Sequence, residues 1–200
     1  MYSKKNSDKA RIIVNTILLD NEVASVLKKM KTISKVTYEH SLNVAFLVAE
    51  ILVPKSLSED EIITITEGAM LHDIGKLKIP LWLLEKNDFL TPEEREIIKL
   101  HPKLGLEVLA SDFSTKKSGI IKNIISMHHE TLDGTGYPYG LKDKEIPWYV
   151  KLVNVVDSYE AMTAERNYGK AYSREDTIEI LKHNEYPTEY IWDILQVDIN

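Results

Sequence analysis

Five of the six histidines lie beside apolar segments, where an imidazole ring is unusual unless it is hydrogen-bonded or binds a metal. These five are His40, His72, His101, His128 and His129. Asp73 follows His72 directly, and Asp157 ends an apolar run that starts at Leu152, where a buried charge is costly without a partner. Taken alone, His72-Asp73 could equally be a hydrogen-bonded pair or a helix C-cap. Together, these imidazole and carboxylate groups suit iron, manganese or zinc, and iron or manganese suit a carboxylate-bridged pair better.

The composition restricts the kind of site and the kind of partner. The chain has no cysteine, which excludes a disulfide scaffold, a zinc ribbon and a thiol nucleophile, so any metal site is built from His, Asp and Glu. Lys and Arg number 25 against 31 Asp and Glu, a net charge of −6 that makes a long nucleic acid an unfavourable partner. A small anionic substrate is still allowed, because a local metal cluster can outweigh the net charge.

The length and the apolar content predict a globular protein. With 200 residues, 44% of them hydrophobic and 28% charged, the chain forms one domain or two small ones. A membrane helix needs a run of about 18 apolar residues, and no apolar run in the sequence is that long. Residues 1–20 lack the apolar core and the cleavage site of a signal peptide. We therefore expect a cytoplasmic protein with no membrane partner.

The spacing of the apolar residues predicts an all-α, single-domain helical bundle, because helical periodicity prevails and alternation is nearly absent. Helix beginnings are marked by caps at Thr37 and Ser173 and by capping-box patterns at Ser58 and Thr91. We expect helices over 8–31 (one or two), 38–52, 58–71, 118–128 and 148–164, with others starting near 91, 102, 173 and 187. A loop over 130–147 and a core that holds Trp82, Trp148 and Trp192 complete this prediction.

Two motifs identify a family. Residues 72–76 have the sequence His-Asp-Ile-Gly-Lys, and residues 128–138 have His-His-Glu-Thr-Leu-Asp-Gly-Thr-Gly-Tyr-Pro. With His40, His101 and Asp157 in order, this pattern strongly resembles the HD-GYP family, a branch of the HD metal-dependent phosphohydrolases. The resemblance covers residues 38–170, about two-thirds of the chain. It implies an all-α bundle with two or three metals that hydrolyses cyclic di-GMP to pGpG, GMP or both.

The resemblance also implies which residues hold the metals. One metal would be bound by His40, His72, Asp73 and Asp157, and the second by Asp73, His101 and His128. Asp73 would bridge the two, since a carboxylate has two oxygens and imidazole cannot span a metal pair. His129 would serve another metal or contact the phosphate. Three-metal members have Glu four residues before the first ligand His, where this chain has Val36, so two divalent metals, Fe or Mn, are expected.

Other positions are assigned to the substrate and to the motif loop. A hydroxide between the metals would attack the phosphodiester, and Lys76 would act as an electrostatic partner or as an acid. Tyr137 would stack on a base or shape the mouth of the pocket. Glu130 and Asp133 would orient ligand histidines or brace the loop.

The chain departs from the family pattern in the stretch that reads the guanine. Glu160 stands where members have Asp, and Gly169 replaces a basic residue, for which Lys170 would compensate. Arg166 matches the pattern, so Glu160, Arg166 and Lys170 join Lys76 and Tyr137 as substrate-binding candidates. The departures leave two alternatives open: an HD-type hydrolase of another nucleotide, or a metal-retaining regulatory module with little turnover.

The domain division follows from the position of the motifs. Residues 1–36 are expected to form an N-terminal helical segment that acts as a cap or as a dimer contact. Residues 37–200 are expected to form the catalytic domain of the HD-GYP type. Besides a cyclic dinucleotide, a second copy of the chain or a separate signalling protein is the expected partner.

Overall fold

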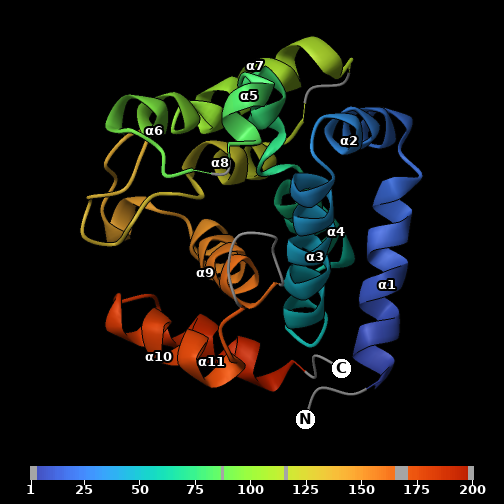
Figure 1. The fold of residues 1–200 in the computed structure, drawn as a ribbon. Helices are drawn as coiled ribbons and strands as arrows, with labels where there is room; N and C mark the ends of the chain where they lie inside the picture. The colour runs from blue at the N-terminus through green and yellow to red at the C-terminus, as the bar shows by residue number, and fades with distance from the viewer. Residues whose placement is uncertain (1–3, 87, 115–116, 165–170, 198–200) are drawn as a thin grey trace.

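The computed structural model describes residues 4–86, 88–114, 117–164 and 171–197, and within them every regular element is a helix (Figure 1). The all-α prediction is therefore confirmed. The longer helices are α1 (Lys4–Leu18), α2 (Asn21–Ile33), α3 (Lys35–Leu52), α4 (Glu59–Leu71), α7 (His101–Asp112), α8 (Gly119–Met127), α9 (Trp148–Thr163), α10 (Arg174–His183) and α11 (Thr188–Gln196). The short elements are η1 (Ile74–Lys78), α5 (Leu81–Leu84), α6 (Pro92–Ile98) and η2 (Asp143–Glu145).

Helix α3 is the central element of the bundle. It packs against α1, α2, α4 and α9, and Figure 1 shows α1, α3 and α4 upright beside one another. Helix α3 is apolar over most of its surface, which a helix enclosed by several neighbours requires. Val44, Ala45, Val48 and Ala49 are fully buried there.

The remaining helices pack at the two ends of α3. Helix α7 packs against η1 and α8, and α8 also packs against α4 and α9, so this layer closes the top of the bundle in Figure 1. Helices α10 and α11 pack against α9 at the opposite end. The polypeptide therefore brings the ends of α4 and α8 and the start of α7 to one place beside α3 and α9.

The capping signals in the sequence located most helix starts. Ser58 with Glu61 and Thr91 with Glu94 form the expected capping boxes of α4 and α6. Asp20 caps α2, so the segment 8–31 is two helices. The expected cap at Thr37 is wrong, because the Ser34 hydroxyl accepts from the Thr37 amide at 3.2 Å and α3 starts at Lys35, three residues before the expected start.

The expectation that the three tryptophans lie in the core is also wrong. Trp82, Trp148 and Trp192 are 60%, 42% and 56% exposed. Each lies on the outer side of its helix, and aliphatic neighbours such as Leu83 and Ile191 take the buried positions. Aliphatic residues thus fill these sites without a ring N–H that needs a partner.

The N-terminal helices are part of the same core. Ala10, Ile13 and Ile17 of α1 are buried, and α1 packs against α3 and α4. The division at residue 36, and a role of this segment as cap or dimer contact, stay predictions. No helix in the described ranges is long and apolar enough to span a membrane.

Candidate metal centre

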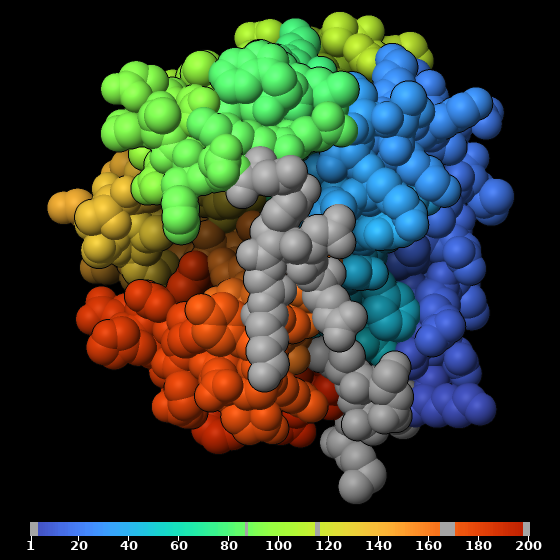
Figure 2. Space-filling model, viewed as in Figure 1, coloured from blue at the N-terminus to red at the C-terminus, as the bar shows by residue number. Residues whose placement is uncertain are grey.

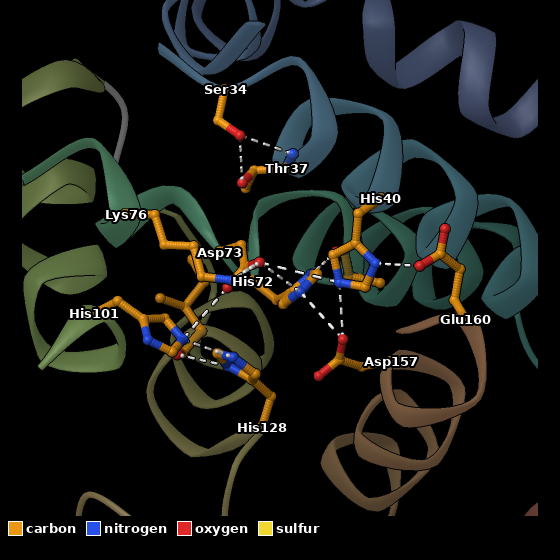
Figure 3. Close-up of polar contacts among 12 residues, drawn as sticks. Ser34, Thr37, His40, His72, Asp73, Lys76, His101, His128, Asp157 and Glu160 are labelled. Carbon is orange, nitrogen blue, oxygen red and sulfur yellow. Dashed lines mark hydrogen bonds and ion pairs between the residues drawn. The ribbon is translucent and has the colours of Figure 1, made fainter. Parts of the chain in front are cut away.

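The fold brings together all seven residues that the sequence suggested as metal ligands. His40 lies in the second turn of α3 and Asp157 within α9, while the others lie at helix ends. His72 and Asp73 follow the last turn of α4, His101 begins α7, and His128 and His129 follow α8. Figure 3 shows six of them with their side chains converging between α3, α4, α7, α8 and α9.

The first group of ligand atoms consists of His40, His72 and Asp157, whose side-chain atoms lie within 4.8 Å of one another. His40 Nε2 lies 2.8 Å from Asp157 Oδ1, and His72 Nε2 lies 3.8 Å from the same oxygen. All three residues are buried. This is a compact set of two imidazoles and one carboxylate.

The second group consists of Asp73, His101, His128 and His129, also within 4.8 Å of one another. His101 Nε2 lies 3.3 Å from Asp73 Oδ1 and 3.1 Å from His128 Nε2. The other oxygen, Asp73 Oδ2, lies 3.4 Å from His72 Nε2 in the first group. The two oxygens of one carboxylate thus face the two groups, which is the arrangement that a bridging ligand requires.

Helix ends fix the tautomers of three histidines. The Nδ1 atoms of His72, His101 and His128 lie 2.7 to 3.1 Å from carbonyl oxygens of Ala69, Ile98 and the Ile124–Ile125 pair. These carbonyls belong to the last turns of α4, α6 and α8, where the helix supplies few further N–H donors, although the Ile124 carbonyl also accepts from the His128 amide. A carbonyl only accepts, so each Nδ1 carries the proton and each Nε2 presents a lone pair to the centre.

The protein groups alone leave this centre unsatisfied. His72 Nε2 and Asp73 Oδ1 are buried and make no hydrogen bond. His101 and His128 point the lone pairs of their Nε2 atoms at each other across 3.1 Å. Buried lone pairs that face one another without a donor are unfavourable, and a cation between them removes the repulsion. The donor set of imidazole nitrogens and carboxylate oxygens fits divalent iron, manganese or zinc.

The protonation states of the rings suit metal binding. Burial lowers the pKa of His101 to about 3, that of His129 to about 4, and that of His128 well below its usual value. For His40, burial also lowers the pKa, but hydrogen bonds to Asp157 and Glu160 outweigh it and raise the pKa to about 9. His101, His128 and His129 are thus neutral at pH 7, the state in which imidazole binds a metal, and His40 is held by carboxylates on both sides.

The substrate candidates Lys76 and Tyr137 lie at the edge of the centre. Lys76 Nζ lies 2.6 Å from Asp73 Oδ2, and its side chain is 25% exposed. The Tyr137 ring stacks on His129, with ring centroids 4.7 Å apart and an interplanar angle of 27°. Lys99 Nζ lies 5.7 Å from the centroid of the Tyr137 ring. Basic and aromatic groups therefore border the ligand cluster.

Two carboxylates, those of Glu130 and Asp133, hold the loop that carries Tyr137. Bracing this loop is one of the two roles expected for them from the sequence. Glu130 is buried and accepts from the amides of Tyr139 and Leu141 at 2.6 and 2.9 Å. Asp133 accepts from the hydroxyl of Thr131 and from the amide and hydroxyl of Thr135. A Cβ on Gly136 would lie 2.4 to 2.6 Å from backbone atoms of residues 129–131, so the loop closes directly onto the end of α8.

Close packing of two backbones brings two members of the second ligand group together. A Cβ on Gly75 would lie 1.9 Å from the carbonyl oxygen of His101 and 2.5 Å from the amide of Gly105. Only glycine allows η1 to approach α7 this closely. The Asp73 and His101 side chains meet because of this approach.

Two asparagines near the ligands were not predicted from the sequence. Asn154 Nδ2 donates to the carbonyl of His128 at 2.6 Å, and Asn43 Nδ2 donates to Glu160 Oε1 at 2.8 Å. Asn43 lies one helical turn after His40, and Asn154 about one turn before Asp157, a spacing that could have singled them out.

Of the other substrate candidates, Glu160, Arg166 and Lys170, only Glu160 lies within the described residues. The buried Glu160 carboxylate contacts His40 Nδ1, so it is directed into the ligand cluster. Arg166 and Lys170 lie outside the described residues, as does Gly169. His183, which the family pattern does not include, is exposed on α10.

Comparisons with known proteins place this geometry in a family. Residues 14–189 match the HD domain family. The chain is 36% identical over 183 residues to a cyclic di-GMP phosphodiesterase of Thermotoga maritima, covering 88% of this chain and 48% of that protein. A cyclic di-GMP phosphodiesterase response regulator of Xanthomonas campestris is 38% identical over 144 residues, covering 72% and 37%. The chain thus spans less than half the length of these relatives.

A second kind of relative and a solved structure complete the comparison. A 3′3′-cGAMP-specific phosphodiesterase of Vibrio cholerae is 31% identical over 153 residues, covering 76% of this chain and 32% of that protein. The structure of an HDG"Y"P protein from Bdellovibrio bacteriovorus superposes with a TM-score of 0.65 at 20% identity. That match covers 96% of this chain and 72% of the other, and it confirms the expected fold. Since the matched segment includes nearly every described helix and both ligand groups, the chain belongs to the HD domain family.

Proposed function

We propose that this protein is a metal-dependent phosphodiesterase that hydrolyses cyclic di-GMP to pGpG, GMP or both. The observation that carries the proposal is the position of Asp73, whose two oxygens face two separate groups of imidazole nitrogens. A carboxylate in this position would suit a two-metal centre for phosphoester hydrolysis. The similarity to cyclic di-GMP phosphodiesterases supports this choice of substrate.

Each metal has a proposed ligand set in this chain. His40, His72, Asp73 and Asp157 would hold the first metal, and Asp73, His101, His128 and His129 would hold the second. Iron or manganese is proposed, because both accept mixed imidazole and carboxylate ligands. When bound, such a metal pair neutralises charge on the phosphodiester oxygens and acidifies a water molecule for attack.

The chain supplies further groups to the reaction. Lys76 would place a fixed positive charge beside a non-bridging oxygen or the leaving group, with proton donation to the leaving group as the alternative. Tyr137 would stack on a base or shape the mouth of the site, since it already stacks on His129. Arg166 and Lys170 are proposed guanine contacts on the strength of the family resemblance alone.

A second candidate substrate is another cyclic dinucleotide. The chain is 31% identical to two relatives named as 3′3′-cGAMP-specific phosphodiesterases, and Gly169 departs from the pattern that reads guanine. A metal-retaining regulatory module with little turnover is the third possibility. The fit of every expected ligand to the two groups argues against it.

One assay separates these functions. Manganese- or iron-loaded protein would be incubated with cyclic di-GMP, 3′3′-cGAMP and cyclic di-AMP, and the products separated by chromatography. We expect cyclic di-GMP to be turned over fastest, with Asp73→Asn as the inactive control. Faster cleavage of 3′3′-cGAMP would support the second candidate, and binding of metal and nucleotide without turnover would support the third.

A further inference from the structure

His40 differs from the other ligand histidines in what its Nδ1 atom contacts. The rings of His72, His101 and His128 use backbone carbonyls in the last turns of helices. His40 lies inside α3, where the preceding carbonyls are already bonded within the helix. Its Nδ1 instead contacts the Glu160 carboxylate, as Figure 3 shows. For His40, a side-chain carboxylate thus takes the place of the backbone carbonyl that contacts Nδ1 in the other three rings.

Glu160 is itself held in a fixed orientation. It lies on α9 about one turn after Asp157, so that both carboxylates reach His40, Asp157 at Nε2 and Glu160 at Nδ1. Its other oxygen, Oε1, accepts from Asn43 Nδ2 at 2.8 Å. A carboxylate only accepts, so the nitrogen of the Asn43 amide must face it. Both oxygens of Glu160 are therefore engaged by groups of α3.

We propose that Glu160, oriented by Asn43, is a positioning residue for the metal centre and not a substrate contact. It accepts the Nδ1 proton of His40, which fixes the ring and leaves Nε2 as the ligand atom. The proposal rests on the proposed function only in assuming that His40 binds a metal. Carboxylates that hold a ligand histidine in this way are typically worth 10- to 100-fold in metal affinity.

The position of Glu160 disfavours direct contact with the substrate. The residue is only 5% exposed, and its carboxylate would add negative charge next to an anionic phosphodiester. In the family pattern this position holds Asp. The longer Glu is matched here by Asn43, which supplies a donor to the second oxygen.

The decisive variant is Glu160→Gln, which keeps the shape but changes one acceptor into a donor. Asn43 continues to donate to the amide oxygen, so the new amide nitrogen faces His40 Nδ1 and donates to it. The proton of the neutral ring then lies on Nε2, the atom that must bind the metal. We expect the affinity for Mn²⁺, measured by chelator competition without substrate, to fall about 10- to 100-fold.

A second substitution restores the hydrogen-bond pattern. In the double variant Asn43→Asp with Glu160→Gln, the introduced carboxylate accepts from the glutamine nitrogen and turns the glutamine oxygen toward His40. We expect this charge-conserving exchange to recover Mn²⁺ affinity to within about tenfold of the wild type. Glu179→Gln, an exposed change on α10, is the matched control and should leave the affinity unchanged.

Three results would overturn the proposal, provided that thermal melts show folded variants. Glu160→Gln could bind Mn²⁺ as tightly as the wild type, or the double variant could bind as weakly as the single one. At saturating Mn²⁺, Glu160→Gln could raise KM for the nucleotide with kcat unchanged, which is the behaviour of a substrate contact. Failure of the proposed function looks different, because a wild type inactive on cyclic di-GMP leaves the Mn²⁺ affinities of these variants interpretable.

Discussion

Lys76 Nζ lies 2.6 Å from Asp73 Oδ2, the oxygen that also faces His72. Burial alone would raise the pKa of Asp73, but the charge of Lys76 is the largest opposing influence, and the pKa stays well below its usual range. In the metal-free protein, the lysine thus neutralises the carboxylate that would bridge the metals. A metal bound to this oxygen would therefore share it with Lys76.

This sharing predicts opposite effects of Lys76→Met on binding and on catalysis. Removing the ammonium group removes a positive charge next to the cations, so Mn²⁺ affinity should rise by up to about tenfold. Hydrolysis should fall about 100-fold or more, as expected when one fixed donor to the reacting phosphate is lost. Chelator competition and kcat measure the two effects. The control is Lys78→Met, which removes a lysine paired with Glu107. If Lys76→Met lowered both the Mn²⁺ affinity and kcat, the prediction would be contradicted.

Asp73→Asn should abolish tight binding of both metals and bring hydrolysis below detection. The change keeps the size of the side chain but removes the charge that would separate two cations. Elemental analysis and the nucleotide assay check this. His183→Ala should affect neither measurement, because His183 is exposed on α10. Two retained metals per chain in folded Asp73→Asn protein would refute the assignment of the bridge.

The protein should bind two metals per chain. Val36, where three-metal relatives have Glu, is 49% exposed, and the nearby Glu39 pairs with Lys35 at 3.2 Å on the surface. Neither residue belongs to the two ligand groups. Elemental analysis of reconstituted protein should approach two ions. Three well-occupied peaks in anomalous diffraction maps would show that the ligand set is larger.

The metal-free protein should lose stability as the pH falls from about 6.5 to about 4. Unfolded histidines take up a proton near pH 6.5, whereas burial keeps the pKa of His101 near 3 and that of His129 near 4. The unfolded state therefore binds more protons in this window, so acid favours unfolding. The raised pKa of His40, about 9, has the opposite sign: its contribution is full below pH 6.5 and is lost as the pH rises to about 9.

Melting temperatures of chelator-treated protein between pH 4 and pH 9 test these signs together. We expect a maximum near neutrality and a steeper fall on the acid side, where His128 adds to the effect of His101 and His129. His128→Asn should reduce the acid slope. A melting temperature that rises steadily toward pH 4 would contradict both the burial and the neutral state of these rings.

Gly75→Ala should damage both the fold and the second ligand group. The added Cβ would lie 1.9 Å from the carbonyl oxygen of His101, so η1 must move away from α7. Overpacking of this kind costs about 1–3 kcal/mol or more in the free energy of unfolding. Gly119→Ala is the matched control, because its Cβ would meet nothing within 4 Å, and it should be neutral or slightly stabilising. Similar melting temperatures for the two variants would contradict the prediction.

The sequence predicted what local signals encode. The capping boxes at Ser58 and Thr91 use hydrogen bonds within four residues, and the ligand histidines stand out as polar groups next to apolar runs. The contact between Asn43 and Glu160 and the approach of Gly75 to His101 join segments far apart in the chain. Such pairs depend on tertiary packing, which apolar periodicity does not specify.

The predictions for the cap of α3 and for the three tryptophans were wrong for a similar reason. Ser34 and Thr37 are both acceptable caps, and α3 uses Ser34, which is also the C-cap residue of α2. A large apolar ring such as that of Trp82 is typical of a core residue, but Leu83 occupies the single buried position of the short α5. Composition predicts how much apolar surface is buried, and the packing of neighbouring helices decides which side chain is buried.

The ligands of this centre come from five helices, from His40 in α3 to Asp157 in α9, so a bound metal pair would tie together chain segments that have no covalent link. Because the metal pair would bind only where these segments are folded together, it would stabilise the folded chain, and only while the metal is present. Proteases act on opened chains, so the metal-free form should be degraded sooner than the loaded form. We therefore expect the amount of this protein in a cell to follow the supply of its metal as well as its rate of synthesis.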